Sequence, residues 1–136
     1  MKRLSAGHTT TIDLALFVLR VWFGLLLFVK HGLDKAMNFN RMSVHFADPF
    51  HIGPTPSFLL VLFAEMVCAL LVALGLWTRV AAGIVVIDFA VAFGFAHHFQ
   101  LFGQRNGELA FVYLGAFLTL CIAGAGRWSL DGLRGR

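Results

Sequence analysis

Four long apolar runs dominate this sequence, at residues 12–32, 57–78, 80–101 and 107–126. Each is close to the ~20 residues that an α-helix needs to cross ~30 Å of hydrocarbon. Hydrophobic residues make up 59% of the 136-residue chain and charged residues only 13%, so this composition cannot cover a water-soluble fold. The runs therefore predict an all-α membrane protein, a four-transmembrane-helix bundle that forms a single domain over residues 1–136.

The segments outside the runs limit what else the chain can contain. The longest of them, at residues 33–56, is too short to fold alone without a disulfide or a metal, so we expect no extramembrane enzyme domain. The first run carries Arg20 and lacks a small-x-small cleavage motif at its end. It is therefore predicted to be a retained span and not a signal peptide.

The basic residues lie at the ends of the runs, where bilayer topology places them. Four crossings put both termini on one side, and the positive-inside rule makes the more basic side cytoplasmic. The terminal side has Lys2, Arg3, Arg79, Arg127, Arg134 and Arg136, and the other side has Lys30, Lys35, Arg41 and Arg105. Both termini are therefore predicted to be cytoplasmic. The formal charge of +4 forms no basic stripe, so we expect no nucleic-acid partner.

Three charged residues interrupt the apolar runs: Arg20, Glu65 and Asp88. A charged side chain in the middle of a spanning helix costs about 2.5–3.5 kcal/mol on the insertion scale, so we expect it to find a partner inside the bundle. Arg20 and Glu65 differ in depth by about 6 Å, which an extended arginine can bridge. We therefore predict a buried charge cluster of Arg20, Glu65 and Asp88. A purely structural role, in which such a cluster fixes helix register, stays open.

Each run places an ionisable residue on a helix face that also contains small residues. Side chains advance by about 100° per residue along a helix. Small residues mark the faces on which membrane helices pack closely. The faces predicted to point inward are Arg20, Gly24, Leu27 and His31; Glu65, Ala69, Val72 and Leu76; Asp88, Ala81, Ala92, Phe95 and Phe99; and Glu108, Val112, Gly115, Thr119, Ile122 and Gly126.

Polar residues on the predicted external side supply further candidates, and we select His31, Lys35 and Glu108. The histidines show no metal-ligand spacing, so no metal site is predicted. Cys68 and Cys121 match no CxxC motif and are expected to pack as small hydrophobes. The 15 phenylalanines can wall a quinone cleft or simply face lipid. No autonomous catalytic motif is present, so no catalytic residue is assigned.

Several short motifs occur in an order and spacing that cover most of the chain. They are Arg20-Val-Trp-Phe-Gly24, Lys30-His31-Gly32-Leu-Asp-Lys35, Asp48-Pro-Phe-His-Ile-Gly53, Ala64-Glu65, Gly75-Leu-Trp-Thr-Arg79, Gly107-Glu108 and Gly124-Ala-Gly126-Arg-Trp-Ser-Leu-Asp131. Together they resemble the DoxX family of integral membrane proteins. The resemblance implies a four-helix protein of the bacterial inner membrane. It also implies an association with redox or sulfur metabolism, because the family takes its name from a membrane subunit linked to thiosulfate:quinone oxidoreductase.

Three functions remain open on this basis. The leading one is a membrane subunit of a quinone-linked, sulfur-compound oxidoreductase complex whose buried charges support a quinone or handle protons. Its candidate cofactor is a quinone, and its partners are the lipid bilayer and membrane, periplasmic or cytoplasmic redox proteins, or a second copy of the chain. The alternatives are a non-catalytic membrane anchor or assembly protein and a small-solute or proton carrier. A family resemblance transfers fold more safely than chemistry.

Overall fold

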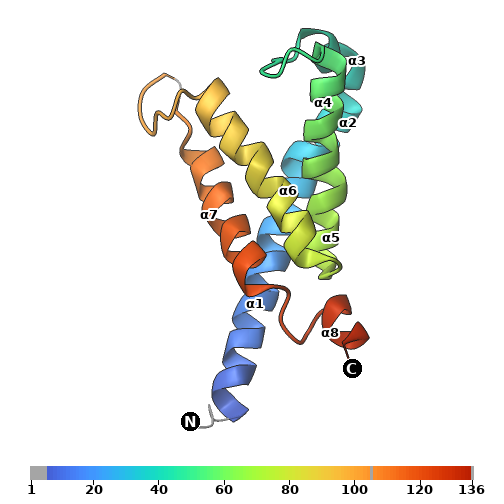
Figure 1. Cartoon of the computed structure of the whole chain (residues 1–136), viewed down its shortest axis with the longest axis vertical. Coiled ribbons are helices and arrows are strands. Elements are labelled where there is room, and N and C mark those ends of the chain that lie inside the picture. Colours follow the sequence, from blue (N-terminus) through green and yellow to red (C-terminus); the bar gives the residue numbers. More distant parts are fainter. Residues whose placement is uncertain (1–5, 105, 136) are drawn as a thin grey trace.

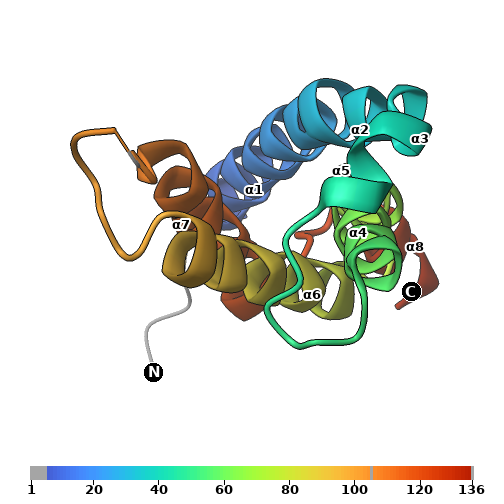
Figure 2. The same ribbon diagram turned by 90° about the horizontal axis from the view of Figure 1, so that it is seen from above.

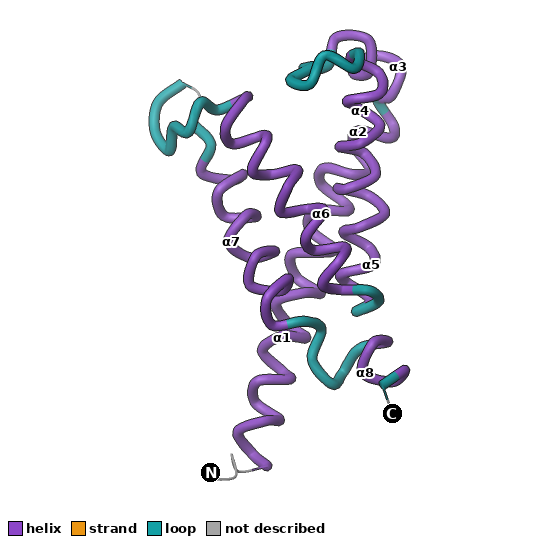
Figure 3. Tube along the Cα trace, viewed as in Figure 1, coloured by secondary structure: helices purple, strands orange, loops and turns teal. Residues whose placement is uncertain are grey.

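Helices account for the regular structure of this protein. The computed structural model describes residues 6–104 and 106–135, and these two ranges contain no strand. Long helical rods alternate with short connections (Figure 3). The rods are α1 (Ala6–Leu27) with η1 (Phe28–Leu33) and α2 (Asp34–Met37); α4 (Pro54–Leu62) with η3 (Phe63–Cys68) and α5 (Ala69–Leu74); α6 (Thr78–Val91) with η4 (Ala92–Ala96); and α7 (Glu108–Ala123). The shorter elements are α3 (Phe39–Met42), η2 (Ser43–His45) and α8 (Leu130–Arg134). The predicted all-α class is confirmed.

Three of the rods are long and apolar enough to cross a membrane. They are Thr9–Met37, Pro54–Leu74 and Thr78–Ala96. The fourth rod, α7, is also apolar but has 16 residues, about 24 Å of helix. It ends at Ala123, before the predicted end of the run, because Gly124 adopts a φ of +84° that breaks the helix. The chain is a multi-pass helical membrane protein, and a crossing by α7 stays a prediction.

The rods lie close together at one end of the molecule and diverge toward the other (Figure 1). α6 packs along α7, while α1 packs against α5 and α7. The start of α1 and the short α8 lie where the rods converge, which we call the terminal end. α2, α3, the connection at 46–53 and the segments 97–104 and 106–107 lie at the opposite end, which we call the loop end. Fully buried core side chains come from all four rods: Leu27, Val72, Val85, Phe117 and Leu120.

The inward face of α7 differs from the predicted one. The structure buries Ala110, Tyr113, Phe117 and Leu120. The predicted stripe instead faces outward: Glu108 is exposed, and Ile122 is 71% exposed. The cause is that α7 is apolar on every side, so small or polar residues do not mark its packing face. Aromatic side chains fill the contact with the neighbouring rods in their place.

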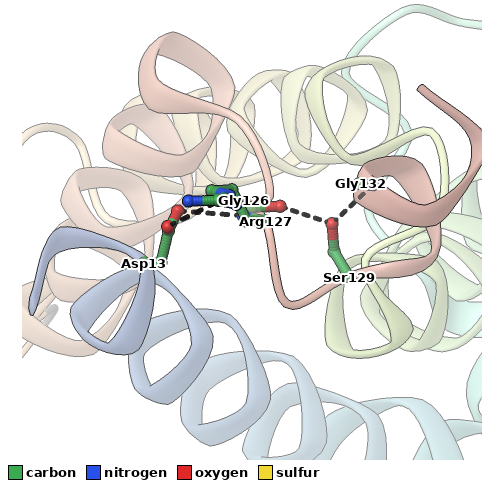
Figure 4. A network of polar contacts seen from close by, with 5 residues as sticks. All are labelled: Asp13, Gly126, Arg127, Ser129 and Gly132. Atoms are coloured by element: carbon green, nitrogen blue, oxygen red, sulfur yellow. Dashed lines mark hydrogen bonds and ion pairs between the residues drawn. The ribbon is translucent and has the colours of Figure 1, made fainter. Parts of the chain in front are cut away.

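The chain after α7 folds back under the terminal end through a series of polar contacts (Figure 4). The Asp13 carboxylate of α1 accepts a hydrogen bond from the Arg127 amide at 2.9 Å. The Ser129 hydroxyl donates to the Gly126 carbonyl at 2.6 Å and accepts from the Gly132 amide at 2.9 Å. Ser129 is thus the N-cap of α8. These contacts fasten the C-terminal segment to the start of the first rod.

Asp131 of α8 fastens the same segment to the third rod. Its two carboxylate oxygens accept hydrogen bonds from the backbone amides of Trp77 and Thr78 at 2.8 and 2.9 Å, where α6 begins. Its own amide donates to the Gly75 carbonyl at 2.8 Å. Desolvation pushes the pKa of Asp131 upward, but the hydrogen bonds from the α6 amides outweigh it and lower that pKa below its usual value. A side chain distant in sequence therefore caps α6.

Candidate functional site

The buried arginine lies at the terminal end, apart from the two buried carboxyl groups. Arg20 is 2% exposed, and its guanidinium donates to the backbone carbonyls of Ala73 and Trp128. Ala73 lies in the last turn of α5, where carbonyls lack partners within the helix, so Arg20 caps that helix. The predicted cluster of Arg20 with Glu65 and Asp88 is therefore wrong.

The position of the first rod explains this correction. α1 begins at Ala6, before the apolar run, and extends beyond the other rods at the terminal end (Figure 1). Arg20 consequently lies near the connection between α5 and α6 and not midway along the bundle. Lys35 lies about 22 Å further along the same rod, toward the loop end. Lys35, and not Arg20, forms the contact with Glu65.

Lys35 and Glu65 form a buried ion pair between the first and second rods. The ammonium group of Lys35 donates to the carboxylate of Glu65, and their side chains are only 14% and 6% exposed. Gly32 permits this contact, because a Cβ at that position would lie 2.6 Å from the Glu65 carbonyl oxygen. The predicted candidates Lys35 and Glu65 thus come together, in a pairing that sequence reasoning missed.

The carboxyl group of Asp88, on α6, lies beside this pair and has one oxygen atom that accepts no hydrogen bond from the described residues. Its Oδ2 atom is buried and has no hydrogen-bond partner among the described residues. The carboxyl group interacts electrostatically with both Glu65 and Lys35. Two carboxyl groups therefore share one neighbouring ammonium group. A buried polar atom without a partner is costly. Among the described residues, Arg20 Nε and Thr78 Oγ1 at the terminal end share this property, but of the three only Asp88 lines the cleft.

A series of packed aromatic rings connects the first rod to α7 next to these charges. The ring of His31 packs edge-on against Tyr113 at 5.5 Å between centroids. Tyr113 in turn stacks on Phe89 at 5.0 Å and is 2% exposed. Tyr113 is the only tyrosine in the sequence, in an otherwise apolar run, and that was the signal available for finding it.

One cleft lies beside these charges, lined by residues from all four rods; Tyr113 lies behind its wall and is not among the lining residues. Its volume is about 760 Å³, within the ~300–1,000 Å³ typical of small-molecule sites. His31, Lys35, Glu65 and Asp88 all line it. Figure 1 shows α4 and α6 diverging around this region toward the loop end. The phenylalanines that line the cleft are Phe46, Phe50, Phe63, Phe89 and Phe95.

Segments of π-helix occur in each of the three rods that are long enough to span a membrane. η1 contains His31, η3 contains Glu65, and η4 begins one turn after Asp88. A π-helical segment inserts an extra residue into a helix and turns the residues beyond it to a new face. Such segments concentrate at functional sites, and here all three lie beside the cleft. Counting faces at a constant helical angle cannot anticipate them.

The connection at 46–53 loops out from the start of α4 toward α6 at the loop end (Figure 2). Phe46, Ala47, Pro49 and Phe50 of this connection line the cleft. The carboxylate of Asp48 ties the connection to α4 by accepting from the Ser57 hydroxyl at 2.8 Å. It also accepts from the backbone amides of Ile52 and Gly53 at 3.0 and 2.8 Å. Desolvation pushes the pKa of Asp48 upward, but these hydrogen bonds outweigh it and lower that pKa below its usual value.

Glu108 is not part of the cleft. It is exposed at the start of α7, where its amide donates to the Asn106 side chain at 2.8 Å. The predicted external-side group of His31, Lys35 and Glu108 is therefore divided, with only His31 and Lys35 at the cleft. In the described ranges, no group of three or more His, Cys, Asp or Glu residues is arranged to hold a metal ion.

Comparisons with known proteins agree with the motifs along the chain. The model of the DoxX family matches residues 15–98, which include Lys35, Glu65 and Asp88. An uncharacterized protein of Haemophilus influenzae is 32% identical over 113 residues, covering 77% of this chain and 80% of that protein. No solved structure matches significantly.

Proposed function

This chain belongs to the DoxX family of membrane proteins, and from that premise we propose that it is an inner-membrane subunit of a quinone-linked redox complex. The cleft between the rods is the proposed site for the quinone head group. The observation that carries the proposal is the buried, unpartnered Oδ2 of Asp88 beside an ammonium group in an aromatic cleft.

The residues of the cleft fit a quinone ring by size and by chemistry. Phenylalanine rings provide stacking surfaces for a flat ring. The ammonium group of Lys35 is a hydrogen-bond donor for a ring carbonyl, and the carboxyl group of Asp88 is an acceptor for a ring hydroxyl. A bound quinone would supply an acceptor for electrons and protons together. The carboxyl groups of Glu65 and Asp88 would hold or pass the protons, while the aromatic walls exclude water.

The proposal includes a topology for the membrane. α7 makes the fourth crossing, and both ends of the chain lie in the cytoplasm of a bacterial cell. Arg79, Arg127 and Arg134 support this orientation, because they lie at the terminal end of the rods and the positive-inside rule places such residues in the cytoplasm. The cleft would then open in the outer half of the inner membrane. The sequence carries no CxxC motif, so its electrons are proposed to come from partner redox proteins.

The direct test is purification from native membranes in mild detergent, followed by identification of bound quinones and proteins by mass spectrometry. We expect the wild-type protein to carry quinone above the level of the surrounding lipid. Asp88→Asn should lose most of it. Glu108→Gln is the matched control, because this carboxylate is exposed and lies outside the cleft, and it should retain quinone. Equal quinone in the wild type and Asp88→Asn would overturn the proposal. A constant protein partner without quinone would favour the anchor alternative.

A further inference from the structure

We infer that the cleft receives its ligand sideways from the bilayer, through an opening between the second and third rods. It therefore selects amphiphiles, with a polar head and an apolar tail, over water-soluble molecules. The inference rests on the proposed function only for the identity of the head group as a quinone. The evidence for the route itself is the exposure of the residues that line the cleft, their depth in the membrane and the position of the connection at its loop end.

The opening is defined by side chains that line the cleft and are exposed at the same time. Leu60 is 59% exposed on α4, Phe63 is 46% exposed on η3, and Ile87 is 65% exposed on α6. A residue that meets both conditions lies at the edge of a cavity. These three come from the two rods on either side of the cleft, so the cleft opens between them on the side of the molecule.

The depth of this edge places it in hydrocarbon. Ile87 lies at the middle of the Thr78–Ala96 span, about 13 Å from either end of that helix. The hydrocarbon core is ~30 Å thick, so the midpoint of a spanning helix lies near its centre. A molecule at this opening is therefore surrounded by acyl chains. An apolar tail is stable there, whereas a water-soluble molecule loses its hydration.

The 46–53 connection narrows the loop end of the cleft without closing it, since Phe50 and the facing Phe95 are each 58% exposed. Phe50 of this connection packs against Phe95 of η4 at 6.1 Å between ring centroids, and both line the cleft. The connection is held from the other side by the hydrogen bonds between Asp48 and the start of α4. It thus bridges the second and third rods at the loop end (Figure 2).

The chemistry of the cleft orients such a ligand. Lys35, Glu65 and Asp88 provide the polar partners, and Asp88 Oδ2 is free for a hydrogen-bond donor such as a hydroxyl group. The exposed edge at Leu60 and Ile87 is apolar. The head of the ligand therefore binds at the charges, and its tail leaves through the side opening into lipid.

The first experiment compares two quinones in proteoliposomes: a decyl-tailed benzoquinone and the same ring without the tail. A flexible bis-maleimide links Phe50→Cys to Phe95→Cys, in a chain that also carries Cys68→Ala and Cys121→Ala, and so holds the loop end shut. We expect the tailed quinone to bind at least about tenfold more tightly, a difference of about 1.4 kcal/mol, and to bind equally well after cross-linking. Loss of its binding on cross-linking would overturn the side route while leaving the quinone proposal intact.

The second experiment needs no quinone. A photoreactive long-chain alcohol is activated in the same vesicles, and the labelled residues are mapped by mass spectrometry. We expect labelling inside the cleft, and Ile87→Trp should reduce it by blocking the opening. Val80→Trp is the matched control, because Val80 is 69% exposed on the same helix but does not line the cleft. Labelling of the cleft without binding of either quinone would support the side route and reject the quinone. Equal labelling in the two tryptophan variants would overturn the side route.

Discussion

The two ends of the molecule use buried charge in different ways. At the terminal end, Arg20 donates to backbone carbonyls and Asp131 accepts from backbone amides, so both charges complete the ends of helices. In the cleft, which extends from the middle of the rods toward the loop end, Lys35 and Glu65 pair with each other, and Asp88 keeps a carboxyl oxygen without a partner among the described residues. One set of charges is committed to the backbone, whereas the other faces a cavity.

This difference separates stability from function within a single small bundle. Capping charges satisfy helix ends that every folded copy must satisfy, so they act on the free energy of unfolding. Charges that face a cavity remain available to a ligand, which can add hydrogen bonds that the protein itself does not supply. Substitutions of the capping charges should therefore change the free energy of unfolding, whereas substitutions of the charges in the cleft should change ligand retention.

The largest expected effect is on Arg20, because removing it leaves buried carbonyls without a donor. Arg20→Met should lower the free energy of unfolding by about 2–4 kcal/mol, since each unsatisfied buried group costs about 1–3 kcal/mol. Reversible unfolding in mixed detergent would measure it. Arg20→Lys, which keeps the charge but only one donating group, should lose less. A wild-type unfolding free energy for Arg20→Met would contradict the capping role.

Gly32→Ala tests the contact that brings the first and second rods together. A Cβ there would lie 2.6 Å from the Glu65 carbonyl oxygen, so the rods must separate, at a cost of about 1–3 kcal/mol. Both the free energy of unfolding and ligand retention should fall, because Lys35 moves away from Glu65. Gly115→Ala is the control: no atom lies within 4 Å of its added Cβ, so it should be neutral or slightly stabilising. Equal effects of the two changes would reject the close contact.

Asp131→Asn tests the capping role at the terminal end, because its effect on the free energy of unfolding should depend on pH. Asn keeps one of the two accepting oxygens, so loss of the charge and of the second acceptor at the start of α6 should cost about 0.5–1 kcal/mol near neutral pH. The pKa of Asp131 is lowered by folding, so its stabilisation is fully present above the ordinary Asp pKa of about 3.9 and is lost as pH falls through the folded-state value. The difference between wild type and variant should therefore shrink in strong acid. A difference that grows on acidification would contradict this sign.

The smallest effect on stability is expected at Asp88. Asp88→Asn changes a half-buried carboxyl group whose Oδ2 has no hydrogen-bond partner among the described residues, so the free energy of unfolding should stay within about 0.5 kcal/mol of wild type or rise. Ligand retention should nevertheless fall about tenfold, the equivalent of about 1.4 kcal/mol. Measuring the free energy of unfolding and quinone retention on one preparation would separate a structural role of Asp88 from a role in ligand binding. A large loss of stability with unchanged retention would make Asp88 a structural residue and remove the contrast between the two ends.

The helices were accessible from sequence because their signal is local. Apolar length located every rod. The inward faces of the first two rods were also predicted correctly, since Leu27, Ala69 and Val72 are all fully buried. Small and charged residues identify a packing face in those rods. In α7, where no side is polar, the same reasoning selected the wrong face. It was also wrong at the loop end of the third run, where Phe95 and Phe99 are 58% and 74% exposed.

The candidate residues were only partly predictable. Glu65 and Asp88 stand out as charges inside apolar runs, and both line the cleft. Their partner was misassigned, because depth was counted from the edge of the apolar run while α1 begins earlier. The contact of Asp131 with α6 joins residues far apart in the chain, and no local pattern marks it.

The amino-acid sequence by itself determined that this chain is helical, membrane-bound and related to the DoxX family. Composition and apolar length predict these features because the bilayer imposes a similar length and the same backbone hydrogen bonding on every spanning helix. The tertiary structure alone decided that Arg20 caps a helix and that Lys35 meets Glu65. Those partners depend on how far each rod slides along its neighbour and on the π-helical turns that redirect its side chains, and both are set by packing between rods.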